Sequence, residues 1–391
     1  MSLVQKIRGA YIHCQQELFS WLETRLGALP KQYEKLVRVL EMVRVEDYLP
    51  QKTVGRVGGR PPSHRANLAR AFLAKMVFNI QTTVSLRERL LSDEILRSLC
   101  GWGSDLEVPS ESTFSRAFAE FAKMQLPSRI HESLIQESYA GELVGHISRD
   151  STAIEGREKP VPKSSSKGQK PASKAPESIL EEVRTILKEV KTDPEECAKA
   201  PRRLELQPTM ELEDMLEDLP QDCKVGCKRN AQGHTNRWTG FKLHMDTADH
   251  GIPISCIVTS ASLHDSQVAI PLSRMTQQRV TSLYDLMDSA YDAKELYEES
   301  RASGHVPIID KNPRKKKAEH QREQTAQRHA GLVLPERLRY RERSTVERAF
   351  GRLKDEFGAR NLRVRGYEKV TCHLMFGVLV LTVDQLLKLV Q

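Results

Sequence analysis

The middle of the chain alternates between strand-like and helix-like segments, and this alternation constrains the fold more than any other feature. It opens with two strand patterns on either side of an Asp-His-Gly turn, a hairpin signal within Phe241–Ala261. Helix-forming sequence at His264–Met275 and Ala293–Ser303 then separates the strand-like stretches Ser282–Asp288 and His305–Asp310. An opening hairpin followed by such alternation predicts a mixed α/β sheet.

The sequence on either side of this region is largely helical in pattern. Residues 1–62 and 66–100 carry apolar side chains at helical spacing. Val108–Lys123 presents an apolar face that fits the reading helix of a helix-turn-helix, although a plain helical bundle is the alternative. We therefore expect an all-helical N-terminal region over residues 1–137. Two further helices, Ser344–Phe357 and Glu368–Val390, are expected to close the chain.

A low-complexity stretch rich in Lys, Ser and Pro interrupts the chain at residues 157–182. A helical pattern at Ile179–Val190 and an acidic segment follow it. We interpret residues 157–222 as a partly disordered insertion within one domain. That domain would comprise residues 138–156 and 223–390.

Charge is distributed unevenly along the 391 residues, whose net charge is +8. Residues 311–369 contain 18 Lys and Arg against 8 Asp and Glu, so the remainder is slightly acidic. Such segregation favours a polyanionic partner, although a solvated helical surface explains a basic run equally well. The start of the chain lacks a signal-peptide pattern, and the apolar run at Leu374–Val383 is half a membrane span. We expect a cytoplasmic protein that has no membrane partner.

Two aspartates stand where strand-like segments pass into loops. Asp150 ends Leu143–Asp150, and Asp288 ends the strand-like stretch before SAYD. In open α/β sheets sites are built at such positions, although a turn or helix-cap role explains either residue alone. Asp285 competes with Asp288, but the two point to opposite faces of a strand, and we favour Asp288 because it ends the strand. Three further acids remain alternatives: Asp246, Asp265 (which could instead cap the next helix) and Asp310.

A third acid, Glu347, belongs to a polar stripe near the C-terminus. With Tyr340, Arg343 and Lys354 it projects within one sector of about 60° on a continuous helix. A glutamate flanked by an arginine and a lysine suits a metal-binding carboxylate beside cations that hold phosphate. The alternative is an ion pair within the helix, because Arg343 and Glu347 are four residues apart.

These residues carry a resemblance to a known class of enzyme. Asp150, Asp288 and Glu347, in this order, resemble the acidic triad of DDE transposases. The stripe is similar to the Y-R-E-K signature of one insertion-sequence branch of that class. The phrases CKVGCKRN…WTGFKLHMD and VTSASLHDSQ are similar to the segments between its first two acids. The resemblance covers roughly residues 40–390, and the long insertion after Asp150 departs from the pattern.

The resemblance implies an α/β fold with a ribonuclease-H-like, mixed-sheet catalytic domain behind an all-helical region for DNA binding or assembly. It implies a transposase that binds the ends of its insertion sequence, cleaves DNA and transfers strands. Its partners would be double-stranded DNA, namely the terminal inverted repeats and the target, and a second copy of the chain in a homodimer on DNA.

The resemblance also implies a set of site residues and a cofactor. Two Mg²⁺ ions, for which Mn²⁺ could substitute, would be held by three catalytic carboxylates, because hard cations prefer carboxylate oxygens. The catalytic and metal-binding residues would be Asp150, Asp288 and Glu347. The DNA-binding residues would be Tyr340, Arg343 and Lys354.

Other interpretations of the same sequence compete with this one. Cys223, Cys227 and His234 have spacing that zinc tolerates, but a fourth ligand is not apparent. Trp238 could stack on a flipped base, although core packing is the more common use of such a residue. The competing functions are a catalytically inactive DNA-binding protein on the same fold and a ribonuclease-H-like nuclease without strand transfer.

Overall fold

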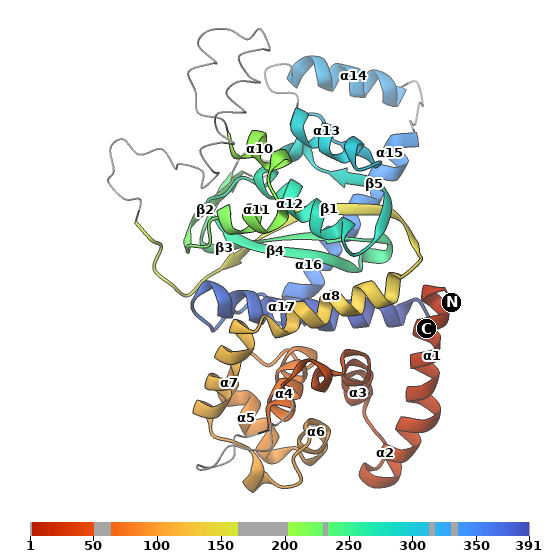
Figure 1. Cartoon of the computed structure of the whole chain (residues 1–391), viewed down its shortest axis with the longest axis vertical. Coiled ribbons are helices and arrows are strands. Elements are labelled where there is room, and N and C mark those ends of the chain that lie inside the picture. The colour runs from red at the N-terminus through yellow and green to blue at the C-terminus, as the bar shows by residue number, and fades with distance from the viewer. Residues whose placement is uncertain are drawn as a thin grey trace.

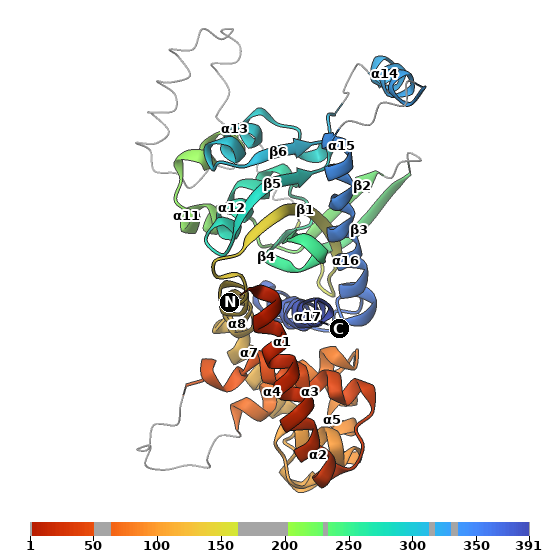
Figure 2. The same cartoon turned by 90° about the vertical axis from the view of Figure 1, so that its right-hand side faces the viewer.

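The computed structural model describes six parts of the chain: residues 2–50, 64–162, 202–229, 234–312, 317–329 and 335–390. A layer of helices lies at one end and an α/β unit at the other (Figure 1). Two long helices, α8 and α17, run side by side between them and contact each other extensively (Figures 1 and 2). The expected helix at 179–190 and most of the expected insertion lie outside the described residues.

The α/β unit is built on one six-stranded sheet with the strand order β2-β3-β1-β5-β6, and β4 also pairs with β3. β1 is antiparallel to β3 and parallel to β5, and β5 is parallel to β6. The predicted mixed α/β sheet is therefore observed. The strands are β1 Leu143–Glu155, β2 Lys224–Arg229, β3 Thr235–Thr247, β4 Pro253–Ser260, β5 Thr281–Met287 and β6 Val306–Ile309.

The predicted hairpin corresponds to β3 and β4. The turn between them contains His250 and Gly251, which both have positive φ, at 63° and 74°. A Cβ atom at position 251 would also lie 3.3 Å from the carbonyl oxygen of Thr345, so the position favours glycine. β3 begins at Thr235, earlier than expected, because its first half pairs with β2 rather than with β4.

Helices cover both faces of the sheet (Figure 2). α16 packs on β1 and β3, and α12 packs on β3 and β4. The short helices α10 and α11 lie over α12, so the end of the expected insertion is folded. These helices and their neighbours are α10 Arg203–Leu206, α11 Leu212–Asp218, α12 Ser266–Gln277, α13 Lys294–Ala302, α14 Lys317–His329, α15 Pro335–Tyr340 and α16 Ser344–Glu356.

The first part of the chain is helical wherever the structure describes it. Gly27 has positive φ and stops α2, so residues 1–62 do not form one unbroken helical run. The predicted face of α7 is buried, including Phe114, Phe118 and Phe121. The helices are α1 Leu3–His13, α2 Phe19–Leu26, α3 Lys31–Val43, α4 Arg65–Val77, α5 Thr83–Ser92, α6 Glu94–Cys100, α7 Glu111–Lys123 and α8 Leu126–Tyr139, with a π-helical turn at Cys14–Leu18 and 3-10 turns at Val45–Tyr48 and Asp105–Glu107.

The C-terminal helix α17, Tyr367–Lys388, lies between the helical layer and the α/β unit. It packs against α3, α4, α7 and α8 and also touches β4. Among the described residues it is the one helix long and apolar enough to cross a membrane, but 83% of its most apolar 18-residue window is buried inside the protein. Its apolar surface is therefore satisfied by packing within the chain.

Candidate functional site

Asp150 lies within β1, which pairs with both β3 and β5. The expectation that Asp150 ends its strand is wrong, because pairing with β3 extends β1 to Glu155. The side chain is largely buried, and its Oδ1 accepts a hydrogen bond of 2.7 Å from the backbone N–H of Ser151. Burial and the nearby carboxylate of Asp288 raise the pKa of Asp150 to about 6, although the N–H of Ser151 and the cations Lys228 and Arg343 lower it in part. The two acids are therefore close enough for the charge of one to disfavour the charge of the other.

Asp288 reaches the same place because β1 and β5 are parallel. Arg149 of β1 pairs with Met287 of β5. The next residue of each segment, Asp150 and Asp288, therefore occupies a neighbouring position. The carboxylate of Asp288 caps a short 3-10 turn, Ser289–Tyr291, by accepting a 2.9 Å hydrogen bond from the N–H of Ala290. Burial raises the pKa of Asp288 despite this bond.

Arg343 connects this pair of acids to Glu347. Its Nη1 lies 3.4 Å from Oδ2 of Asp150, and its Nη2 donates to Oε1 of Glu347 at 2.5 Å. The side chain of Glu347 is 53% exposed, whereas that of Asp150 is 10% exposed. The guanidinium thus lies between two of the three predicted carboxylates, and it also lowers the pKa of the third, Asp288.

Lys354 and Tyr340 flank this group on either side. Lys354 Nζ donates a 2.7 Å hydrogen bond to Oγ1 of Thr152, which is two residues beyond Asp150 on β1. The ring of Tyr340 lies 5.7 Å from Cζ of Arg343, and burial raises the pKa of the Tyr340 phenol to about 12.

The polar stripe does not lie on one continuous α-helix. α15 ends at Tyr340, a 3-10 turn spans Arg341–Arg343, and α16 begins at Ser344. The 3-10 turn changes the angle between residues, so the expected common sector is wrong in detail. The expected contact between Arg343 and Glu347 still forms. Glu347 is four residues after Arg343, in the first turn of α16.

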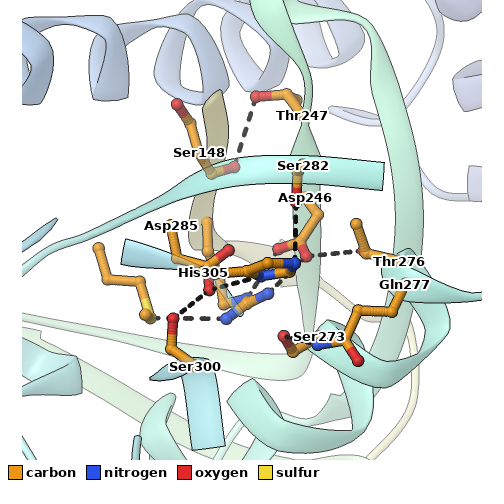
Figure 3. A network of polar contacts seen from close by, with 12 residues as sticks. Ser148, Asp246, Thr247, Ser273, Thr276, Gln277, Ser282, Asp285, Ser300 and His305 are labelled. Carbon is orange, nitrogen blue, oxygen red and sulfur yellow. Dashed lines mark hydrogen bonds and ion pairs between the residues drawn. The ribbon is translucent and has the colours of Figure 1, made fainter. Parts of the chain in front are cut away.

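Hydrogen bonds attach the start of α16 to the sheet. Thr345 Oγ1 donates to the carbonyl of Glu342 at 2.7 Å and lies 3.2 Å from Ser148 Oγ. Thr247 Oγ1 lies 3.4 Å from the carbonyl oxygen of Ser148, a contact visible in Figure 3. These bonds hold Glu347, one turn further along α16, beside the strand that carries Asp150.

Two of the alternative acids belong to a buried polar network on the other side of β1 (Figure 3). Asp246 accepts 2.7 and 2.8 Å hydrogen bonds from Arg149 and another from Thr276. Asp285 accepts from Ser300 at 2.5 Å and lies 3.2 Å from Nδ1 of His305. Both carboxylates are therefore paired within the protein.

The two remaining alternative acids occupy different surroundings. Asp265 forms a 2.8 Å ion pair with Lys242 and occupies the N-cap position of α12, although its side chain makes no capping bond there. Burial would raise the pKa of Asp265, but Lys242 and His244 lower it. Asp310 follows β6, and its backbone N–H bonds to the carbonyl of Met287.

Among the described residues, no group of three or more His, Cys, Asp or Glu side chains is gathered closely enough to hold a metal ion. This applies to the predicted carboxylates and to the zinc alternative. Cys223 is buried, whereas Cys227 on β2 is exposed. Trp238 is buried, and its Nε1 donates to the carbonyl of Phe241 at 3.0 Å, as expected of a residue in the core.

Two residues near the acids were not predicted from the sequence. Lys228 on β2 offsets in part the raised pKa of both Asp150 and Asp288, which burial causes first. Tyr291 is buried next to both acids, and within the described residues its hydroxyl has no hydrogen-bond partner. Its position three residues after Asp288 was the available signal, while Lys228 could be found only from the pairing of β2 with β3.

Comparison with protein families gives two matches. Residues 221–383 match a family model described as Transposase DDE domain, and residues 23–120 match one described as Transposase domain (DUF772). Neither the curated proteins nor the solved structures give a match. The two family matches support an insertion-sequence transposase of the DDE class, and hence an enzyme of the polynucleotidyl transferase and endonuclease class.

Proposed function

We propose that this chain is a transposase that binds the ends of its insertion sequence, cleaves DNA and joins the cut strand to a target. The observation that supports the proposal is that Arg343 contacts both Asp150 and Glu347 and also lies near enough to Asp288 to lower its pKa in part, within the α/β unit. We further propose that the unit is a ribonuclease-H-like domain and that the chain belongs to the Y-R-E-K branch.

The acids fit a divalent cation chemically. Asp150 and Asp288 are close enough to raise the pKa of Asp150, which indicates an excess of negative charge that a cation would relieve. We propose that Asp150, Asp288 and Glu347 hold two Mg²⁺ ions, with Mn²⁺ as a substitute, since hard cations prefer carboxylate oxygens. When bound, such ions activate the attacking oxygen and stabilise the leaving oxygen.

The cations around these acids would position the DNA. Arg343 can bind a phosphate bidentately once it releases a carboxylate, and Lys354 supplies a point charge on the same side of α16. Tyr340 lies beside Arg343 and can donate its hydroxyl hydrogen to a phosphate oxygen, because its raised pKa keeps it protonated. These three residues would orient the scissile bond against the acids.

The rest of the chain would serve assembly on DNA. We propose that the helical layer contributes to binding the terminal inverted repeats, because the second transposase match covers residues 23–120 within it. A homodimer on DNA and a cytoplasmic location complete the proposal.

The direct test incubates the whole protein with labelled duplex DNA that carries the sequences flanking its own coding region. With Mg²⁺ we expect nicks at the ends and joined products, and with EDTA we expect neither. The Glu347→Gln variant should bind the ends and produce no nicks. Nicks without joined products would identify a nuclease, and binding without nicks in the wild type would identify an inactive DNA-binding protein.

A further inference from the structure

A cavity of about 320 Å³ lies where the helical layer meets the C-terminal segment, away from the acids described above. α4 contributes Phe72 and Lys75 to its lining, and α17 contributes Lys369 and His373. The loop between α16 and α17 contributes Arg363–Arg365. This loop continues directly from the helix that carries Glu347 and Lys354.

Lys75 is the unusual residue of this cavity. It is only 5% exposed, yet its ammonium has no ion pair and no hydrogen bond to any described residue. Burial lowers the pKa of Lys75 to about 8. A buried cation without a partner costs folding free energy, so its presence beside an open cavity requires an explanation.

Three further cations surround the cavity. Arg363, Arg365 and Lys369 are exposed, and none of them forms an ion pair within the described part of the chain. Among the lining residues the only acid is Glu111. His373 donates to the carbonyl of Gly358, and burial together with Lys75 lowers its pKa to about 3, so it is neutral. The cavity therefore carries a clear excess of positive charge.

Two helices also begin at the cavity. Thr83 is the first residue of α5 and Glu111 is the first residue of α7, and both line it. Helix N-termini carry partial positive charge and unpaired backbone N–H groups, which favour an anion. A helix N-terminus alone would not define a site, but here both lie beside the buried, unpaired ammonium of Lys75.

We propose that this cavity binds a phosphodiester group of the DNA backbone, with Lys75 at its base and Arg363, Arg365 and Lys369 at its rim. The inference rests on the proposed function, because DNA is its phosphate source. DNA is favoured over a small free anion because the rim has three exposed cations on the segment that follows α16, the helix that carries Lys354, and a polyanion can engage several such cations at once.

The test compares full-length wild type with Lys75→Met, and with Lys123→Met as a control at an exposed lysine of α7 that does not line the cavity. We expect Lys75→Met to weaken binding of the flanking-end duplex about tenfold and to reduce the slope of log affinity against log salt by about one. Its thermal unfolding midpoint should rise, since an unpaired buried charge is removed. Lys123→Met should leave both properties unchanged.

A second variant distinguishes the loss of a DNA contact from misfolding of the protein. Arg365→Gln with Lys369→Gln changes only exposed side chains, so it should keep the wild-type midpoint while reducing the salt slope by up to about two. If both variants keep the wild-type affinity and salt slope, the proposed phosphate site is wrong, whereas the proposed DNA binding by the protein is unaffected. If the duplex fails to bind wild type at all, the proposed function and the DNA assignment fall together. In that case, stabilisation of wild type but not Lys75→Met by inorganic phosphate would assign the cavity to a free phosphate.

Discussion

Replacing Asp150 by Asn should stabilise the metal-free protein while abolishing its chemistry. At pH 7 the folded chain holds this carboxylate charged, although burial and Asp288 raise its pKa from 3.8 to about 6. Each pH unit between those two values corresponds to about 1.4 kcal/mol, so holding the carboxylate charged lowers the free energy of unfolding by on the order of 3 kcal/mol. Asn keeps the Oδ1 acceptor for Ser151, but Arg343 loses a partner. We therefore expect a net gain of about 1–3 kcal/mol.

The sign of the pH dependence follows from the raised pKa. Because the folded state binds a proton more readily than the unfolded state, Asp150 favours folding increasingly as the pH falls from about 6 to about 4. Asp150→Asn lacks this dependence. The matched control is Asp285→Asn, because burial raises the pKa of Asp285 but His305 and Arg149 lower it by more. Removing that charge should destabilise the protein.

The assay is thermal unfolding of the three proteins at several pH values, first in EDTA and then with Mg²⁺. In EDTA the midpoint of Asp150→Asn should lie above wild type and that of Asp285→Asn below it. Mg²⁺ should raise the wild-type midpoint more than that of Asp150→Asn, because a ligand that binds only the folded state stabilises it. A lower midpoint for Asp150→Asn in EDTA would refute the reasoning about its pKa. Equal stabilisation of both proteins by Mg²⁺ would exclude Asp150 as a ligand.

Three further substitutions test the rest of the site. Glu347→Gln should abolish end cleavage with near-normal DNA binding, and near-native nicking would show that Glu347 holds no metal. Arg343→Lys should reduce cleavage at least about tenfold despite the retained charge, because a lysine cannot contact two partners bidentately, and cleavage is measured on the labelled ends. Lys354→Ala should weaken end binding and flatten the salt slope by about one, with Lys294→Ala on α13 as the exposed control. An unchanged slope with lowered stability would show that Lys354 serves only its bond to Thr152.

Local patterns predicted most of the elements of the α/β unit. The hairpin, α12, α13, β5 and β6 were found from periodicity and turn residues, because each depends on neighbours in the sequence. Strand geometry indicated that only one of Asp285 and Asp288 can meet Asp150, and Asp288 was preferred because it ends the strand and fits the resemblance. Asp285 lies in the buried network with His305. Boundaries were less accurate, as in β3, whose length depends on pairing with β2 across a gap in the chain.

The sequence by itself determined which residue types could form a site and the order in which they occur, since the acids and the Arg343–Glu347 spacing are local properties of the chain. Only the tertiary structure decided what they contact. Arg343 meets Asp150 across 193 residues, and the orphaned hydroxyl of Tyr291 and the unpaired ammonium of Lys75 can be recognised only once their surroundings are known. Burial and charge pairing arise between segments far apart in sequence, so the periodicity of the sequence cannot predict them.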